Sequence, residues 1–236
     1  MAISYMDYTS PSTQFTYDLN NNPIFRKDSR NYINELSIMQ LNTLGNASLL
    51  DIFLSISNIV EPHYHQNASE LVYCISGSAV VSLINPFTNE LLNFPITPGQ
   101  VANVPQGWWH YEIATVDNTH LLAIFDAPIP ETIFGSDILR LTPPSILAHT
   151  YCLNEAKVKD TLAPIQSTVV IGPLKTVTYV RLKEKCNNNN TKIPPMLILI
   201  KVIMQTMDNN SHISQSFLPK KHYKKFQQLH EQLSPY

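Results

Sequence analysis

Short apolar runs broken by turn residues occupy the middle of the chain, from about residue 45 to residue 126. Runs this short at such regular spacing are typical of an antiparallel sandwich or barrel. Proline, glycine and asparagine mark the turns at Asn85–Asn89, Thr97–Gln100 and Pro105–Gly107. The pattern therefore predicts an all-β fold. The expected strands are Ser48–Ile56, Glu70–Ser76, Ser78–Asn85, Leu91–Pro95, Val101–Val104, Trp108–Thr115 and His120–Phe125.

Helical patterns appear only after residue 140. A first helix is expected at Ser145–Cys152, directly after Pro143 and Pro144, because proline is tolerated in the first helical turn. A second helix is expected at Glu155–Leu162, with Asn154 as its N-cap. These two helices form a short C-terminal extension of the β fold.

After residue 165 the apolar and polar residues follow no clear strand or helix pattern. Thr168–Ile171 and Thr176–Leu182 resemble two further strands, and Asn187–Asn190 reads as a loop. The basic stretch Lys220–Lys225 has two interpretations, a solvated helix face or a docking patch for an anionic partner. The sequence therefore predicts an N-terminal arm at 1–35, a barrel at 36–128, a helical extension at 129–165 and a tail of unassigned structure at 166–236.

Composition excludes several classes of partner. Charged residues make up 14% of the 236, and the formal net charge is −2, so no field of one sign recruits nucleic acid or anionic lipid. The three cysteines lie far apart, without a C-x-x-C motif. The longest apolar stretch, Met196–Met204, is interrupted by Lys201 and is too short to span a bilayer. With no basic, apolar start at the N-terminus, we expect a cytoplasmic protein without membrane or nucleic-acid partners.

Four side chains stand out as candidate metal ligands. His63 and His65 are two residues apart, so on a strand both project to one face. Glu70 opens the next apolar run, and His110 opens a later one behind a Pro-Gly turn. Three neutral imidazoles and one carboxylate can hold a divalent first-row metal ion.

The spacing of these residues is specific. The pattern H-x-H-x4-E-x6-G arises by chance roughly three times in ten thousand chains of this composition. Three of the six glycines, Gly77, Gly99 and Gly107, occupy strand ends within the two segments. The alternative, in which the histidines and Glu70 are solvated surface residues, does not account for this spacing.

The two segments resemble the motifs of the cupin superfamily, G-x5-H-x-H-x3–4-E-x6-G and G-x5-P-x-G-x2-H-x3-N. The first motif is matched from His63 to Gly77, but Ser57 stands at its leading glycine. The second is matched from Gly99 to His110, but Ala114 stands at its closing asparagine. The resemblance implies a double-stranded β-helix, the jelly-roll barrel of cupins.

Within that superfamily the chain resembles the germin-like and oxalate decarboxylase-like branch. The segments that carry this resemblance are Leu41–Gly45, Asn67–Glu70, Ile133–Asp137 and Pro144–Ala148. It implies Mn(II) held by the four ligands, helices that mediate subunit packing, and oxalate oxidation, oxalate decarboxylation or superoxide dismutation. Fe(II), Zn(II) and Ni(II) suit the same ligands.

One departure bears on the substrate. Oxalate decarboxylases carry an Arg three residues before the first motif histidine, where Val60 stands here. The planar fork of Arg is the usual clamp for a carboxylate. The chain has four Arg, none of them in either motif, and only Arg140 could reach in from the extension. This departure argues against efficient oxalate decarboxylation.

Glu112 is the candidate catalytic residue. It lies two residues beyond His110, on the same face of a regular strand, where a germin usually has Gln. Beside a metal ion it could act as a general base or orient a ligand imidazole. The alternative is an edge-strand carboxylate that reaches solvent.

Two functions from different classes remain open. The first is a metal-dependent, germin-like oxidoreductase or decarboxylase acting on a small carboxylate such as oxalate, or a superoxide dismutase. The second is a non-catalytic ligand-binding or storage cupin whose metal ion is structural. In both cases we expect a homo-oligomer assembled through barrel edges and the helical extension.

Overall fold

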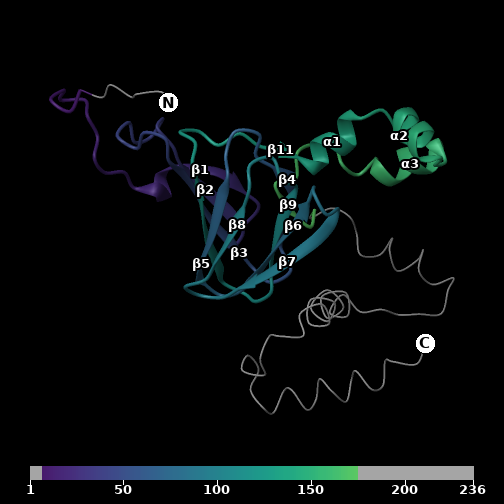
Figure 1. The fold of residues 1–236 in the computed structure, drawn as a ribbon, viewed down its shortest axis with the longest axis horizontal. Coiled ribbons are helices and arrows are strands. Elements are labelled where there is room, and N and C mark those ends of the chain that lie inside the picture. The colour runs from purple at the N-terminus through teal and green to yellow at the C-terminus, as the bar shows by residue number, and fades with distance from the viewer. Residues whose placement is uncertain (1–6, 175–236) are drawn as a thin grey trace, which may run out of the picture. The chain divides into compact units, whose positions relative to one another are not determined.

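The computed structural model describes residues 7–174; residues 1–6 and 175–236 are not described. Within the described part, two antiparallel six-stranded sheets face each other and are followed by three short helices (Figure 1). The all-β jelly roll with a short helical extension is therefore confirmed. The predicted strand Thr176–Leu182, the loop Asn187–Asn190 and the basic stretch Lys220–Lys225 lie outside the described residues.

Between β3 and β10 the chain passes back and forth between the two sheets. The first sheet has the order β1-β2-β3-β10-β5-β8 and consists of β1 (Pro23–Arg26), β2 (Tyr32–Leu36), β3 (Ser48–Leu54), β10 (Thr119–Phe125), β5 (Glu70–Ser76) and β8 (Val101–Val104). The second has the order β11-β4-β9-β6-β7, with β12 also pairing with β4. It consists of β11 (Ile133–Phe134), β4 (Ile59–Tyr64), β9 (His110–Ala114), β6 (Ala79–Asn85), β7 (Glu90–Ile96) and β12 (Ile171–Gly172). The helical elements are η1 (Leu19–Asn21), α1 (Gly135–Leu141), α2 (Pro144–Tyr151) and α3 (Glu155–Leu162).

The apolar core lies between the two sheets. It is formed by apolar side chains of facing strands, for example Ile52 and Leu54 on β3 and Val81 and Leu83 on β6. Cys74 is fully buried in the same cluster, as a small apolar residue. The core explains why short apolar runs were the strongest signal in the sequence.

Several predicted elements match the structure closely. Glu70–Ser76, Val101–Val104 and Glu155–Leu162 have the predicted bounds. The N-cap at Asn154 is also confirmed, because its side-chain oxygen accepts a hydrogen bond from the backbone N–H of Lys157 at 3.0 Å. Each of these elements has a local signal, either a turn or a cap, at its ends.

The N-terminal region differs from the arm predicted for residues 1–35. β1 and β2 lie in this region and extend the first sheet, with β2 paired along β3. Ile33 and Asn34 are buried, and the side-chain oxygen of Asn31 accepts a hydrogen bond from the backbone N–H of Ser55 at 2.8 Å. Strand pairing uses backbone groups that every residue has, so a polar segment can join a sheet without an apolar pattern.

The prediction of a strand at Thr168–Ile171 is correct only at its end. β12 begins at Ile171 and pairs with β4. The backbone N–H groups of Val169 and Val170 donate to the side chain of Glu61 and to no neighbouring strand. Side-chain acceptors thus replace the backbone carbonyls to which these two N–H groups would donate in a strand.

The two departures from the cupin motifs lie next to each other. Ser57 adopts a left-handed backbone with φ of 65°, the conformation that the motif glycine would accept without strain. Its N–H donates to the carbonyl of Ala114 at 2.9 Å, and the N–H of Ala114 donates to the carbonyl of Asn58 at 3.0 Å. Both departures therefore fall at one strand-end turn and leave the four candidate ligands unchanged.

Replacing Ser57 with glycine should stabilise the protein. We expect Ser57→Gly to raise the free energy of unfolding by about 0.5 to 1 kcal/mol, because glycine relieves the left-handed strain at some cost in chain entropy. Urea denaturation measures the change. As a control, Gly77→Ala should lower the free energy of unfolding by about 1 to 3 kcal/mol, because a Cβ there would lie 2.6 Å from the Thr119 Cα. A Ser57→Gly protein no more stable than wild type would contradict the expectation.

Candidate metal centre

The four predicted ligands come together inside the barrel. His63 lies on β4 directly opposite His110 on β9, so the pairing of these two strands sets the two rings side by side. His65 follows the end of β4, and Glu70 opens β5. The candidate ligand atoms of these four residues all lie within 4.8 Å of one another, and all four side chains are buried.

Backbone carbonyls fix the orientation of all three imidazole rings. The Nδ1 of His63 lies 2.7 Å from the carbonyl oxygen of Glu61, and the Nδ1 of His110 lies 2.8 Å from that of Trp108. The Nδ1 of His65 lies 3.0 Å from the carbonyl oxygen of Glu131. A carbonyl only accepts hydrogen bonds, so each ring donates from Nδ1. Each Nε2 is left to face the centre of the cluster, as a metal ligand requires.

The cluster is electrostatically coupled. Burial alone would raise the pKa of Glu70, but the hydrogen bond from His110 and the nearby His65 ring, whose Nε2 lies 3.3 Å from the Oε2 of Glu70, hold it below its ordinary value. Burial by itself would lower the pKa of His110, but the hydrogen bond to Glu70 at 2.8 Å and the charge of Glu70 raise it to about 9. The pKa of His63 is well below its ordinary value, chiefly because of burial and then because of neighbouring His110.

Glu112 lies beside these four residues without being one of them. It is 1% exposed, and its Oε1 is 3.6 Å from the Nε2 of His110. Its pKa is raised to about 8, first by burial and then by the charge of Glu70. The interpretation of Glu112 as an edge carboxylate in solvent is therefore wrong.

The register explains why no Arg faces Glu112 from β4. Val60, at the position where oxalate decarboxylases carry an Arg, is the β4 residue directly opposite Glu112. A valine offers no charge or hydrogen bond to the carboxylate. Arg140, the other candidate, pairs with Asp137 of its own helix at 2.7 Å. Neither position supplies a carboxylate clamp to the site.

The residues present fit a divalent metal ion. Within residues 7–174, four buried side-chain polar atoms have no hydrogen-bond partner, and three of them are here: the Nε2 of His65 and both oxygens of Glu112. Unpaired buried polar groups are costly, and a cation would give the Nε2 of His65 a partner. Three imidazole nitrogens and a carboxylate suit a first-row ion, and the donor set alone does not fix which one.

Other residues noted in the sequence have structural surroundings. The Nε2 of His120 lies 2.5 Å from an Asp51 oxygen, and its ring stacks on that of Phe53. His149 is exposed on α2. Trp108 packs against the core. None of these three belongs to the cluster.

Sequence reasoning missed the role of Glu61. Regular alternation would place Glu61 on the same face as His63. A β-bulge between Val60 and His63 resets that alternation. The Glu61 carboxylate turns instead to α1, where it accepts hydrogen bonds from Ser136. The one signal in the sequence was a charged residue between the apolar Ile59-Val60 and Pro62.

The fold and the cluster define a small β-barrel with a buried three-histidine, one-glutamate site. The chain belongs to the cupin family, because the family model described as Cupin matches residues 21–159. No helix among the described residues has the length and apolarity needed to cross a membrane.

Relatives of several kinds share this barrel. A germin-like protein, subfamily 2 member 1 of Arabidopsis thaliana, is 29% identical over 138 residues, which are 56% of this chain and 62% of the relative. The oxalate decarboxylase of Bacillus subtilis, solved at pH 4.6, superposes with a TM-score of 0.60 at 19% identity, covering 78% of this chain and 47% of that one. Procruciferin, an 11S globulin of Brassica napus, superposes with a TM-score of 0.64 at 18% identity, covering 74% and 46%. At these identities the structural matches establish the fold alone.

Metal affinity should rise with pH. The raised pKa of His110, about 9 in the metal-free protein, means that its ring keeps a second proton below that pH. A metal ion needs the unprotonated Nε2, so binding releases this proton, and affinity should increase ~10-fold per pH unit until about pH 9. Competition with a chelator of known pH dependence, from pH 6.5 to 9, measures the slope. Constant affinity over that range would contradict the assignment.

Proposed function

We propose that this cupin is a metal-dependent oxidoreductase or decarboxylase of a small carboxylate such as oxalate, or a superoxide dismutase, with Mn(II) as the first candidate metal. One observation carries the proposal: the buried side chains of His63, His65, Glu70 and His110 bring their candidate ligand atoms close together. The Nδ1 of each histidine already binds a backbone carbonyl, which leaves each Nε2 for a metal ion. Similarity to a germin-like protein supports the same class. Fe(II), Zn(II) and Ni(II) are alternative occupants.

Four protein ligands favour a reactive site over a closed one. A six-coordinate ion held by four ligands keeps positions for a small molecule, and when bound it supplies Lewis-acid or one-electron chemistry. The chain itself supplies burial, which excludes water, and a proton acceptor. Glu112 carries two unpaired oxygens beside His110, so it can accept or return a proton at Oε1.

Oxalate oxidation or superoxide dismutation is favoured over oxalate decarboxylation. Val60 stands where the resemblance places a carboxylate-binding Arg, and Arg140 is held by Asp137. Neither of these two positions would then add a contact to a metal-bound dicarboxylate.

The second candidate function is a non-catalytic binding or storage module with a structural metal ion. The absent carboxylate clamp favours it, and an 11S globulin shares the fold. The buried, unpaired carboxylate of Glu112 favours the enzyme, because a purely structural site gains nothing from it.

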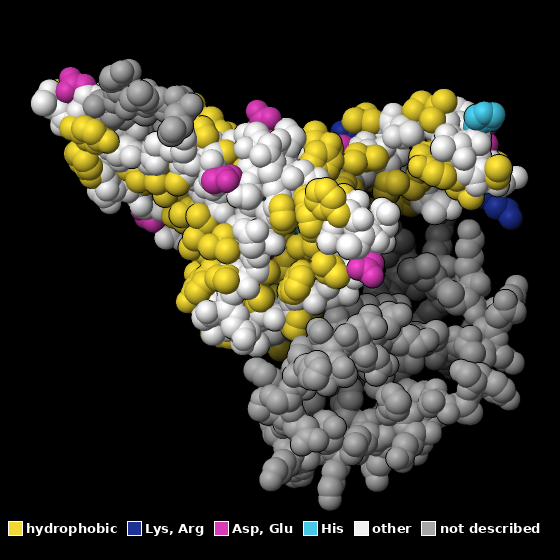
Figure 2. All heavy atoms as spheres, viewed as in Figure 1, with side chains coloured by type: hydrophobic (Ala, Val, Ile, Leu, Met, Phe, Trp, Pro, Cys, Tyr) yellow, Lys and Arg dark blue, Asp and Glu magenta, His cyan; other side chains and the backbone are white. Residues whose placement is uncertain are grey.

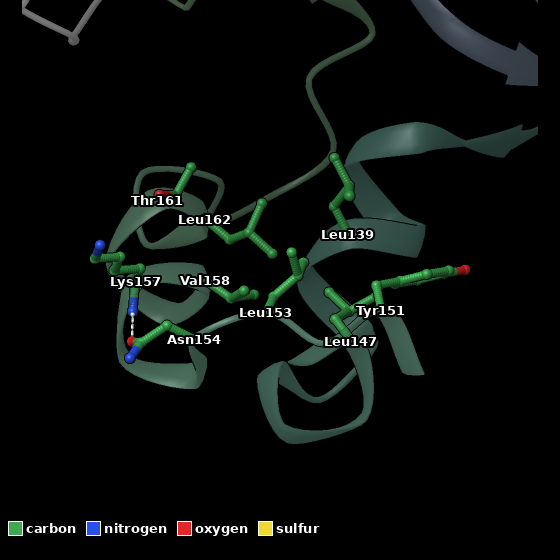
Figure 3. Close-up of a pocket in the computed structure, with 9 residues that line it drawn as sticks. All are labelled: Leu139, Leu147, Tyr151, Leu153, Asn154, Lys157, Val158, Thr161 and Leu162. Carbon is green, nitrogen blue, oxygen red and sulfur yellow. Dashed lines mark hydrogen bonds between the residues drawn. The ribbon is translucent and has the colours of Figure 1, made fainter. Parts of the chain in front are cut away.

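We also propose that the protein is a homo-oligomer, with the extension as one contact. Figure 2 shows apolar side chains spread over this face of the barrel and the helices, with few charged ones among them. An apolar pocket of about 450 Å³ lies on the extension, with Leu139, Leu147, Leu153, Val158 and Leu162 around it (Figure 3). A second copy of the chain would cover these surfaces. A cytoplasmic location, without nucleic-acid or membrane partners, remains a prediction from the sequence.

Metal analysis combined with activity assays tests the function. We expect the purified protein to hold about one divalent ion per chain and, once loaded with Mn(II), to consume oxygen with oxalate or to remove superoxide. Oxygen electrode, CO2 and superoxide assays distinguish the three reactions. Full metal occupancy with no turnover of any small carboxylate or superoxide would favour the binding module.

Glu112→Gln should separate catalysis from metal binding. We expect turnover to fall by about 10²- to 10⁴-fold, the usual contribution of a positioned proton acceptor, while the metal content stays at the wild-type level. Glu90→Gln, at an exposed carboxylate on β7, is the matched control and should leave turnover unchanged. Wild-type turnover in Glu112→Gln would remove Glu112 from the mechanism.

A further inference from the structure

Glu61 occupies a gap in the outer edge of β4, two residues before the first histidine of the site. β11 pairs with β4 at His63 and Tyr64, and β12 pairs with it at Ile59 and Val60. Glu61 therefore lies between the two short strands that cover this edge. Both strands come from the part of the chain that follows the barrel.

The carboxylate of Glu61 fills this gap. It is buried and accepts four hydrogen bonds: from the Ser136 N–H at 2.8 Å and hydroxyl at 2.7 Å, and from the N–H groups of Val169 at 3.1 Å and Val170 at 2.9 Å. We call Glu61, Ser136, Val169 and Val170 the Glu61 junction. The carboxylate accepts from three backbone N–H groups that donate to no strand, one buried at Ser136 and two partly buried at Val169 and Val170; the N–H of Val169 also donates to the Ser136 hydroxyl oxygen at 3.1 Å.

The backbone of Glu61 links the junction to the metal site. Its N–H donates to the carbonyl of Val170 at 2.9 Å, and its own carbonyl accepts the Nδ1 hydrogen bond of His63 at 2.7 Å. The same residue thus holds the segment after α3 and orients a ligand ring. Any rotation of the Glu61 peptide would turn the acceptor away from His63.

Two backbone features indicate that the junction is tightly held. Val170 has φ of 58°, a strained conformation for a β-branched residue, which persists only where the surroundings fix it. α1 begins at Gly135 in close contact with β4, since a Cβ at Gly135 would lie 2.7 Å from the carbonyl oxygen of Pro62. Close approach and strain both occur where the extension meets the ligand strand.

We propose that Glu61 is a positioning residue through which the segments around Ser136 and Val170 hold His63 in its metal-binding orientation. Metal binding and the docking of these segments are then coupled, and the coupling is reciprocal. This inference rests on the proposed metal site, but it does not depend on any turnover.

Glu61→Gln tests the coupling with Co(II), whose visible absorption reports the arrangement of its ligands. The amide offers one acceptor oxygen in place of two, so at least one buried donor loses its partner. We expect Co(II) affinity to fall about 10- to 100-fold, as for other groups that orient ligands, and the absorption spectrum to change. Hydrogen exchange followed by NMR should show metal-dependent protection of the Ser136, Val169 and Val170 amides in the wild type, and loss of that dependence in the variant.

Thr168→Val is the matched control. It removes hydrogen bonds between the Thr168 hydroxyl and Asp137, at 2.9 and 3.1 Å, which join the same two segments without involving Glu61. Its stability should fall while its Co(II) affinity and spectrum stay as in the wild type. Equal losses of affinity in Thr168→Val and Glu61→Gln would overturn the proposal, because they would indicate a general loosening.

Ser136→Ala keeps the proposal testable if Glu61→Gln does not fold. It removes the hydroxyl that donates to Glu61 and accepts from the Val169 N–H, but keeps the Glu61 carboxylate and the Ser136 N–H, so it should weaken Co(II) binding less than Glu61→Gln. Wild-type affinity and unaltered metal-dependent exchange in the folded variant would overturn the inference. Tight Co(II) binding and the expected variant effects in a protein without turnover would contradict the proposed enzyme activity alone.

Discussion

Polar groups buried in an apolar barrel must each find a partner, and this constraint organises the centre of the protein. Three imidazoles and two carboxylates lie among Val, Leu and Phe side chains that offer no hydrogen bonds. Each Nδ1 is paired with a carbonyl, which fixes the rings, while the Nε2 of His65 and both oxygens of Glu112 remain unpaired. Burying such groups without partners costs several kcal/mol. A cation at the centre is the partner that the arrangement lacks.

The ligand strand β4 depends on chain segments on both of its sides. β9 pairs with its inner edge and brings His110 opposite His63. Its outer edge is covered by β11, β12 and the Glu61 carboxylate, so no long edge is left open. The region after the barrel is therefore part of the sheet that carries the site as well as a helical appendage.

The chain keeps the cupin framework and changes the chemistry near its centre. Ser57 and Ala114 replace motif residues at one turn and are joined by a backbone hydrogen bond. Val60 and Glu112 face each other across β4 and β9, close to the ligands. The first pair affects backbone strain, whereas the second pair places an uncharged side chain opposite a buried carboxylate.

Local patterns in the sequence determined the barrel strands with strong turns, the N-cap at Asn154 and the four candidate ligands, because spacing and turn chemistry act over a few residues. Only the tertiary structure decided that the polar segment around Tyr32–Leu36 joins the sheet, that a bulge turns Glu61 away from His63, and that Val60 lies opposite Glu112. Strand register and edge pairing depend on hydrogen bonds between backbone groups far apart in the chain. These groups are nearly the same in every residue, so the residue types do not reveal which of them pair. For this reason the ligands were evident from the sequence, while the residues that orient them and set their charge were not.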